Sequence, residues 1–344
     1  MIEQFKPFGY QIRSSVHITE KQSDNGILED FRIDFQENWR QWPDKSLFFI
    51  LLAAWIGLFH FLGNSTLGYV HSPSLFRWVL DAYHPTGDYP SSEDALGLIV
   101  PFVVLALLWW KRKQLLTLEL KPWWPGLLLV AFALLLHVLG SLIQQPRVSV
   151  LAFIAGLYFL TGLVWGRSWL RASFFPFFLL GFCIPVGTHG QIITTPLRHL
   201  VAMIVSAIAH IGLAPDLVRE GTQLFDAHSA FHYDIAPACS GIRSLVALLL
   251  LTTIVGFLSF QRGWKRLVMV LAAFPLAVVG NVVRITFTVF VAEMLGQNAG
   301  SKVETNFGFI TFAVAIVAVL LLEKWMRERS PELPMGPSLE AEPT

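Results

Sequence analysis

The sequence predicts an all-α polytopic membrane protein with about eight transmembrane helices, an interfacial helix near 196–213 and a short extracytoplasmic β-hairpin. Of its 344 residues, 54% are hydrophobic and only 14% are charged, with a mean hydropathy of +0.56. A soluble protein would carry about 25% charged residues. The net charge of +1 and the two cysteines, which form no C-x-x-C pair, give no sign of a nucleic-acid partner, a metal or a cofactor, and we expect none of them.

The N-terminal segment, residues 1–46, is polar and is expected to be cytoplasmic. Its apolar side chains recur at steps of three and four residues, at Leu28, Phe31, Phe35, Trp39 and Trp42. This spacing predicts an amphipathic helix, which lies either along the membrane surface or against the body of the protein. At the other end, the Pro- and Glu-rich residues 326–344 are expected to form a disordered cytoplasmic tail.

Between these segments, residues 47–325 are expected to form one transmembrane domain. Eight apolar segments are long enough, or nearly so, to cross roughly 30 Å of hydrocarbon. They lie near 47–64, 95–110, 123–143, 148–166, 172–187, 242–260, 267–292 and 307–323. The further apolar stretch 196–213 is interrupted by Arg and His, which favours an interfacial or re-entrant helix. Residues 214–241 alternate weakly in polarity, which predicts the β-hairpin.

Basic residues predict the orientation of the spans. Of the 25 Lys and Arg residues, 18 fall in the two terminal segments and in the alternate loops around 111–121, 167–171 and 261–266. Only five fall in the opposite loops, and two lie inside spans. Because basic loops stay in the cytoplasm, we expect an integral inner-membrane protein with both termini cytoplasmic. Residues 187 and 242 then both lie outside, so the stretch 196–213 does not cross.

Candidate functional residues gather at the outer boundary. The stretch IAPACSGIRSL, 235–245, places Cys239 at the mouth of one span and Arg243 about 6 Å below it. Arg284 is seventeen residues into the span that begins near 267, hence roughly 26 Å from its cytoplasmic end. Asn281 lies one turn beneath Arg284, and Glu304 stands just above the last span. These residues are therefore expected to share one level of the membrane.

The two intramembrane cations also have purely structural explanations. Arg284 could extend to the outer lipid headgroups, as long basic side chains do near helix ends. Arg243 could form a structural ion pair with Glu304 or Asp234.

The two cysteines differ in their surroundings. Cys239 could be a small residue near a helix N-terminus, with Ser240 as the N-cap. However, a helix N-terminus and nearby guanidinium groups both favour the thiolate, which is the reactive form of cysteine. Cys183 lies in an apolar run without such neighbours and is expected to be an inert core residue.

The block PACSGIRSL at 237–245, followed by GNVVRI at 280–285, resembles the exosortase/archaeosortase family of membrane-embedded cysteine transpeptidases. The resemblance extends over residues 150–325. It implies a membrane cysteine protease or transpeptidase that cleaves C-terminal sorting signals of exported proteins, each made of a motif, a membrane helix and a basic cluster. It also implies Cys239 as nucleophile and Arg284 as the essential arginine, at the extracytoplasmic face.

The residues themselves agree with this chemistry. Thiolate attack on a peptide carbonyl gives an acyl-thioester, and a nearby cation stabilises the oxyanion that forms on the way. An amine, a lipid acceptor or water would then release the product. The implied partners are therefore exported substrate proteins, the lipid bilayer and an acceptor.

Glu304 departs from the family pattern. The family usually carries a histidine four residues before the glycine that opens the last span, and here Glu304 holds that place ahead of Gly308. Glu304 is therefore the third catalytic candidate, and the histidines of the outer loop are candidates to substitute for the missing one. The candidates for substrate binding or support are Arg243, Ser240, Asn281, His232 and His228.

Two other functions stay open at this point. One is a polytopic transporter in which Arg243 and Arg284 bind an anion, although transporters place their polar groups near mid-membrane and here they cluster at one surface. The other is an exosortase relative that binds sorting signals without cleaving them.

Overall fold

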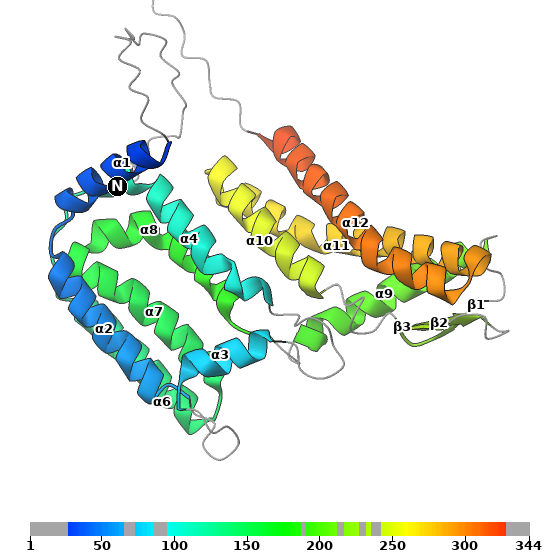
Figure 1. Cartoon of the computed structure of the whole chain (residues 1–344), viewed down its shortest axis with the longest axis horizontal. Coiled ribbons are helices and arrows are strands. Elements are labelled where there is room, and N and C mark those ends of the chain that lie inside the picture. The colour runs from blue at the N-terminus through cyan, green and yellow to red at the C-terminus, as the bar shows by residue number, and fades with distance from the viewer. Residues whose placement is uncertain are drawn as a thin grey trace, which may run out of the picture.

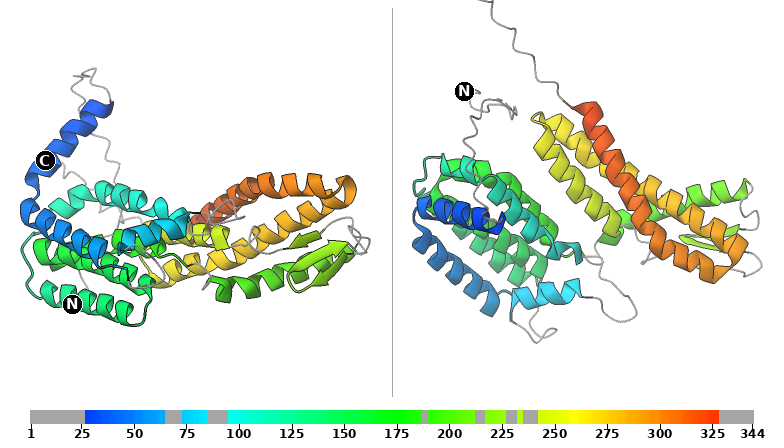
Figure 2. Two further views of the ribbon diagram at one scale, coloured as in Figure 1. Left: turned by 60° about the horizontal axis from the view of Figure 1, so that its bottom comes forward. Right: turned by 45° about the horizontal axis from the view of Figure 1, so that its top comes forward.

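A computed structural model shows a helical protein with one small antiparallel sheet (Figure 1). It describes residues 27–64, 73–84, 95–186, 190–211, 217–226, 232–234 and 242–327. The helices form two groups that stand side by side, α1 to α8 and α9 to α12, and Figure 2 shows the same division from two further sides.

The first helix group contains eight α-helices and two short 3-10 helices. They are α1 (Ile27–Gln41), α2 (Lys45–Phe61), α3 (Leu75–Tyr83), η1 (Ala95–Leu98), α4 (Val100–Trp110), α5 (Arg112–Leu116), α6 (Gly126–Leu142), α7 (Pro146–Trp165), α8 (Arg167–Leu179) and η2 (Leu180–Cys183). Helix α7 is central to this group. The indole N–H of Trp55 on α2 donates to the Phe153 carbonyl on α7 at 3.1 Å. The Trp55 ring lies against Gly156, where a Cβ would come within 1.9 Å of it.

The second helix group contains four helices and the sheet. They are α9 (Gln191–His210), β1 (Leu217–Glu220), β2 (Gln223–Asp226), β3 (His232–Asp234), α10 (Ile242–Ser259), α11 (Gly263–Leu295) and α12 (Gln297–Met326). Gly296 alone separates α11 from α12, with a φ of +85°. Only glycine adopts this left-handed conformation readily, so the residue type permits the sharp reversal between the two longest helices.

Each of the eight predicted segments contains a helix in the structure. Three of the described helical stretches are long and apolar enough to cross a membrane, namely Pro146–Trp165, Gly263–Leu295 and Gly308–Met326. A fourth is reached if α1 and α2 count as one bent span, and Ala95–Trp110, Gly126–Leu142 and Ser244–Ser259 are apolar but shorter. The structure therefore confirms a helical membrane protein, while the number of eight spans stays a prediction.

Helix α1 is the helix expected in the N-terminal segment, and it packs in part against the body of the protein. It meets α2 at a bend of 94°. Asn38 is buried, and Phe35 stacks on Trp109 of α4 with ring centroids 5.7 Å apart, so one side packs on the body. Phe35 and Trp39 nevertheless remain 43% and 42% exposed. The placement along the membrane surface stays a prediction.

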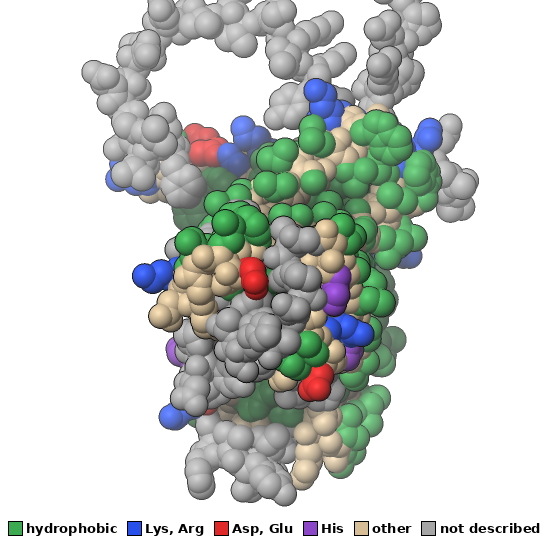
Figure 3. All heavy atoms as spheres, turned by 90° about the vertical axis from the view of Figure 1, so that its right-hand side faces the viewer, with side chains coloured by type: hydrophobic (Ala, Val, Ile, Leu, Met, Phe, Trp, Pro, Cys, Tyr) green, Lys and Arg blue, Asp and Glu red, His purple; other side chains and the backbone are tan. Residues whose placement is uncertain are grey.

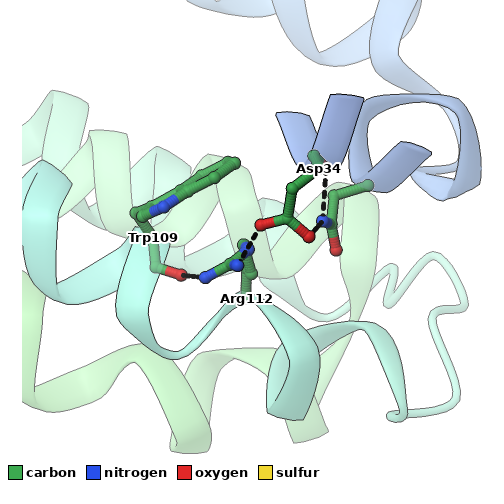
Figure 4. Close-up of polar contacts among 4 residues, drawn as sticks. Asp34, Trp109 and Arg112 are labelled. Atoms are coloured by element: carbon green, nitrogen blue, oxygen red, sulfur yellow. Dashed lines mark hydrogen bonds and ion pairs between the residues drawn. The ribbon is translucent and has the colours of Figure 1, made fainter. Parts of the chain in front are cut away.

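The basic loops that share a predicted side do lie at one end of the molecule. Arg112 forms an ion pair with Asp34 of α1, and its guanidinium lies 4.2 Å from the ring centre of Trp109 (Figure 4). Lys265, at the start of α11, donates to the carbonyl of Met326 at the end of α12 at 2.8 Å. Figure 1 shows α1 and the end of α12 on the same side. The order of the crossings and the orientation in the membrane stay predictions.

The predicted β-hairpin has a third strand. The described sheet is antiparallel in the order β1-β2-β3, with Leu217 opposite Asp226 and Phe225 opposite His232. Leu217 and Leu224 are buried against α9, which explains why the short strands hold together. The sequence predicted only two strands because alternating polarity indicates a strand but does not show which other strands pair with it.

Helix α9 begins earlier and ends earlier than the predicted segment 196–213. One of its faces, built from small and branched residues, packs on the C-terminal half of α11 and on the sheet. This buried cluster contains Val201, Ala202, Val205, Ala209, Leu217, Leu224, Ile285, Val289 and Ala292. Because α9 carries the sheet and contacts α11 beside Arg284, it fixes the sheet next to the candidate site. That the stretch does not cross the membrane stays a prediction.

Candidate functional site

Arg284 lies on α11 between two surfaces. The next residue, Ile285, is buried against α9. Arg284 itself is half-buried, and its Nε atom is fully enclosed by protein. A Cβ atom built on Gly308 would lie 3.7 Å from Nη1 of Arg284, so the guanidinium lies over the backbone of α12. Arg284 therefore points between the helices, which disfavours the explanation that it extends to lipid headgroups.

Glu304 lies on α12 one turn before Gly308. Four residues along an α-helix return to the same face about 6 Å away. The backbone of Glu304 is therefore close to the point at which the Arg284 guanidinium meets α12, although the side chain of Glu304 lies outside the described residues. The structure thus places the backbone of Glu304 one turn from this contact, and a direct contact between the two side chains stays a prediction.

Asn281 and Arg243 approach the same region from α11 and α10. Asn281 is half-buried and three residues before Arg284. Leu245 of α10 belongs to the same buried cluster as Ala277 of α11. Because α10 and α11 form an antiparallel pair, the first turn of α10, which contains Arg243, comes level with the turn of α11 that holds Asn281. The Arg243 side chain lies outside the described residues.

The remaining candidates are placed only in part. Cys239, Ser240 and His228 lie outside the described residues. Helix α10 begins at Ile242, three residues after Cys239. His232 begins β3, and its backbone pairs with Phe225 of β2. The roles of these residues therefore remain as predicted from the sequence.

The structure gives two residues a role that the sequence did not, Gly308 at the site and Arg198 on α9. Gly308 served in the sequence only as a landmark, whereas the structure shows it beneath the Arg284 guanidinium. Arg198 of α9 is half-buried with an enclosed Nε atom, although the sequence placed it simply among outer basic residues. An arginine inside an apolar stretch is the signal that pointed to it. Figure 3 views this end of the molecule and shows basic, acidic and histidine side chains among hydrophobic ones.

The other cysteine has a structural position. Cys183, in η2, is half-buried and packs against the core of the first helix group. Its carbonyl accepts a hydrogen bond from the Tyr83 hydroxyl. Among the described residues, no group of three or more His, Cys, Asp or Glu side chains is arranged to hold a metal ion.

Comparison with known families decides which family the chain is in. A family model described as transmembrane exosortase matches residues 88–321, well over half of the chain. The chain belongs to the transmembrane exosortase family. No curated protein and no solved structure matches it.

Membership in the exosortase family confirms the resemblance and extends it. The match begins at residue 88 rather than 150, so it includes α4 to α8 as well as the second helix group. All eight candidate residues lie within it, whereas α1 to α3 precede it. As a family member with long apolar helices, the chain is an integral membrane protein.

Substitution of Gly308 tests the contact with Arg284. Gly308→Leu should lower cleavage of a sorting signal, the activity that the resemblance implies, by about tenfold or more because the side chain displaces the guanidinium. Gly308→Ala should keep most of the activity, since its Cβ would make only an ordinary van der Waals contact at 3.7 Å. Gly57→Leu on α2 is a matched control, because no atom lies within 4 Å of its Cβ position. Equal activity of the Leu and Ala variants of Gly308, at equal protein levels, would contradict the contact.

Proposed function

We propose that the chain is a membrane cysteine protease or transpeptidase that cleaves C-terminal sorting signals of exported proteins through an acyl-thioester. The observation that carries the proposal is the Arg284 guanidinium, enclosed between α11 and α12 beside Gly308 and one turn from Glu304. A half-buried cation held between two helices suits a developing oxyanion. Family membership supports the same function.

The proposed reaction begins when the Cys239 thiolate attacks the carbonyl carbon of the scissile peptide bond. The resulting tetrahedral oxyanion accepts hydrogen bonds from Arg284, whose planar fork offers two donors. Collapse breaks the carbon–nitrogen bond, the leaving amine takes up a proton, and an acyl-thioester remains on Cys239. An incoming amine, a lipid acceptor or water then attacks the thioester, loses a proton and restores the thiolate.

Glu304 is proposed to orient Arg284 rather than to carry protons. A glutamate has an ordinary pKa of about 4.3, which makes it a weak acid–base near neutral pH. A carboxylate one turn from a guanidinium is, however, well placed for a charge-assisted hydrogen bond. The proton-carrying role would then fall to His228 or His232, or to water.

The proposed location is the inner membrane, with both termini cytoplasmic and the site at the extracytoplasmic face. The contacts that join α1 to α5, and the start of α11 to the end of α12, support this orientation because they gather the basic loops at one end. Substrates would be exported proteins whose C-terminal helix enters the bilayer, where recognition would be partly helix against helix.

Family membership favours this enzyme over an anion-binding transporter. A second candidate, a relative that binds sorting signals without cleaving them, is favoured by one observation. Glu304 stands where the family usually has histidine.

Thiol labelling tests the orientation. A membrane-impermeant thiol reagent applied to intact cells should label the Cys183→Ala protein, through Cys239, and spare the Cys239→Ala protein, whose remaining thiol is half-buried. Labelling of Cys239 only after the inner membrane is permeabilised would show that the orientation is reversed.

The two cysteine variants also test the proposed chemistry. Cys239→Ala should abolish processing of the cognate signal protein, because no acyl-thioester can form. Cys183→Ala should leave processing largely intact, since Cys183 packs against the core of the first helix group. Processing is followed by the size of the substrate protein on gels, at matched levels of the variants. Normal processing by Cys239→Ala would eliminate thiol catalysis.

Variants of Glu304 distinguish a carboxylate that orients Arg284 from one that carries protons. Glu304→Gln should keep much of the activity, because an amide oxygen still accepts a hydrogen bond from Arg284. Glu304→Ala should lose more, and Glu304→His should be tolerated. Processing rates are compared at equal expression. A Glu304→Gln protein as inactive as Cys239→Ala would identify Glu304 itself as the proton carrier.

A further inference from the structure

The two helix groups meet through aromatic rings near the basic end. Phe175 of α8 stacks on Phe257 of α10, with centroids 4.6 Å apart and planes inclined by 11°. Phe178 lies 6.1 Å from the same Phe257 ring. These rings form a seam between the groups, and the seam is defined here by Phe175, Phe178 and Phe257.

One cation from each helix group lies at this seam. The guanidinium of Arg266, on α11, lies 4.7 Å from the centre of the Phe257 ring, and its Nε donates to the Phe260 carbonyl at 2.8 Å. From the other group, Lys111 donates to the carbonyl of Ala172 at 3.4 Å. Ala172 lies one turn before Phe175 on α8. Both cations are half-buried.

Neither cation is neutralised within the part of the chain that the structure describes. Ion pairs join Asp34 to Arg112, Glu119 to Lys121 and Glu323 to Arg327, and none of these pairs includes Lys111 or Arg266. Burial, and then the charge of Arg266, lower the pKa of Lys111. Two half-buried like charges at one seam repel each other, which disfavours close packing of the two helix groups there.

An anion with several oxygens would reverse this repulsion. A phosphate group can accept from the planar fork of Arg266 and from the ammonium of Lys111 at once. The seam lies near the end of the molecule that gathers the basic loops, and in a membrane protein such basic loops lie at the level of the lipid headgroups. Free phosphate offers the same oxygens from the aqueous side.

We propose that the phosphate group of an anionic lipid headgroup, or free phosphate, binds between Lys111 and Arg266 and holds the first helix group against the second. The site is separate from the candidate catalytic residues, which lie toward the other end of α11. The proposed phosphate site contributes to the stability of the fold, so it is tested by measuring unfolding and not by measuring cleavage.

The test measures the midpoint of thermal unfolding of the full-length protein in a neutral detergent. Phosphatidylglycerol should raise the midpoint by about 3 °C or more, whereas zwitterionic phosphatidylcholine should not. Inorganic phosphate is tested separately. If millimolar phosphate raises the midpoint as much as phosphatidylglycerol does, the site is supported and its ligand is free phosphate. If neither anion shifts the wild-type protein, the proposal is overturned.

Variants locate the effect. Lys111→Gln and Arg266→Gln should lose the stabilisation by the anion, whereas Arg266→Lys should keep part of it. Lys113→Gln is the matched control, because Lys113 belongs to the same basic run and is exposed. In detergent without anion, Lys111→Gln should unfold at the same or a higher temperature than wild type, since it removes the repulsion. Equal stabilisation of all variants by the anion would show that it acts elsewhere and overturn the site.

Discussion

A guanidinium within a membrane span must be enclosed by protein or reach water, since hydrocarbon offers it no hydrogen bonds. Arg284 satisfies this constraint by lying between α11 and α12 over Gly308. The arrangement requires two long helices in close contact, a glycine where the side chain crosses, and a third helix, α9, on the other side of α11. The sheet is carried by α9, so α9, α12 and the sheet are all placed close to the part of α11 that contains Arg284.

Much of the fold follows from the length of the apolar segments, because an apolar segment long enough to cross the hydrocarbon forms a helix. A helix lies at each of the eight predicted places, but their lengths differ from the apolar runs. Helix α11 extends from Gly263 to Leu295, beyond the predicted 267–292 at both ends. Backbone hydrogen bonds continue into polar flanks that hydropathy does not mark. The third strand also escaped prediction, because pairing between strands depends on tertiary register.

The candidate site was predictable where it depends on depth along a helix. A fixed rise of 1.5 Å per residue relates position in sequence to level along a helix, which is why the turn of α12 that contains Glu304 could be expected near Arg284. The contact with Gly308 was not predictable, because it depends on how α11 and α12 are rotated about their axes. The placement of Cys239 beside Arg284 rests on the sequence and on family membership.

Because the chain reverses at Gly296, the number of residues on each side of it determines which residues of α11 and α12 lie opposite each other. Arg284 and Gly308 each lie twelve residues from Gly296, so the two arms of the hairpin have equal length. One residue added to either arm would turn its side chains by about 100° and shift them by about 1.5 Å. The guanidinium would then face lipid or another helix instead of the glycine. The contact between Arg284 and Gly308 therefore constrains the number of residues in the α11–α12 helix pair as well as the identity of the two residues.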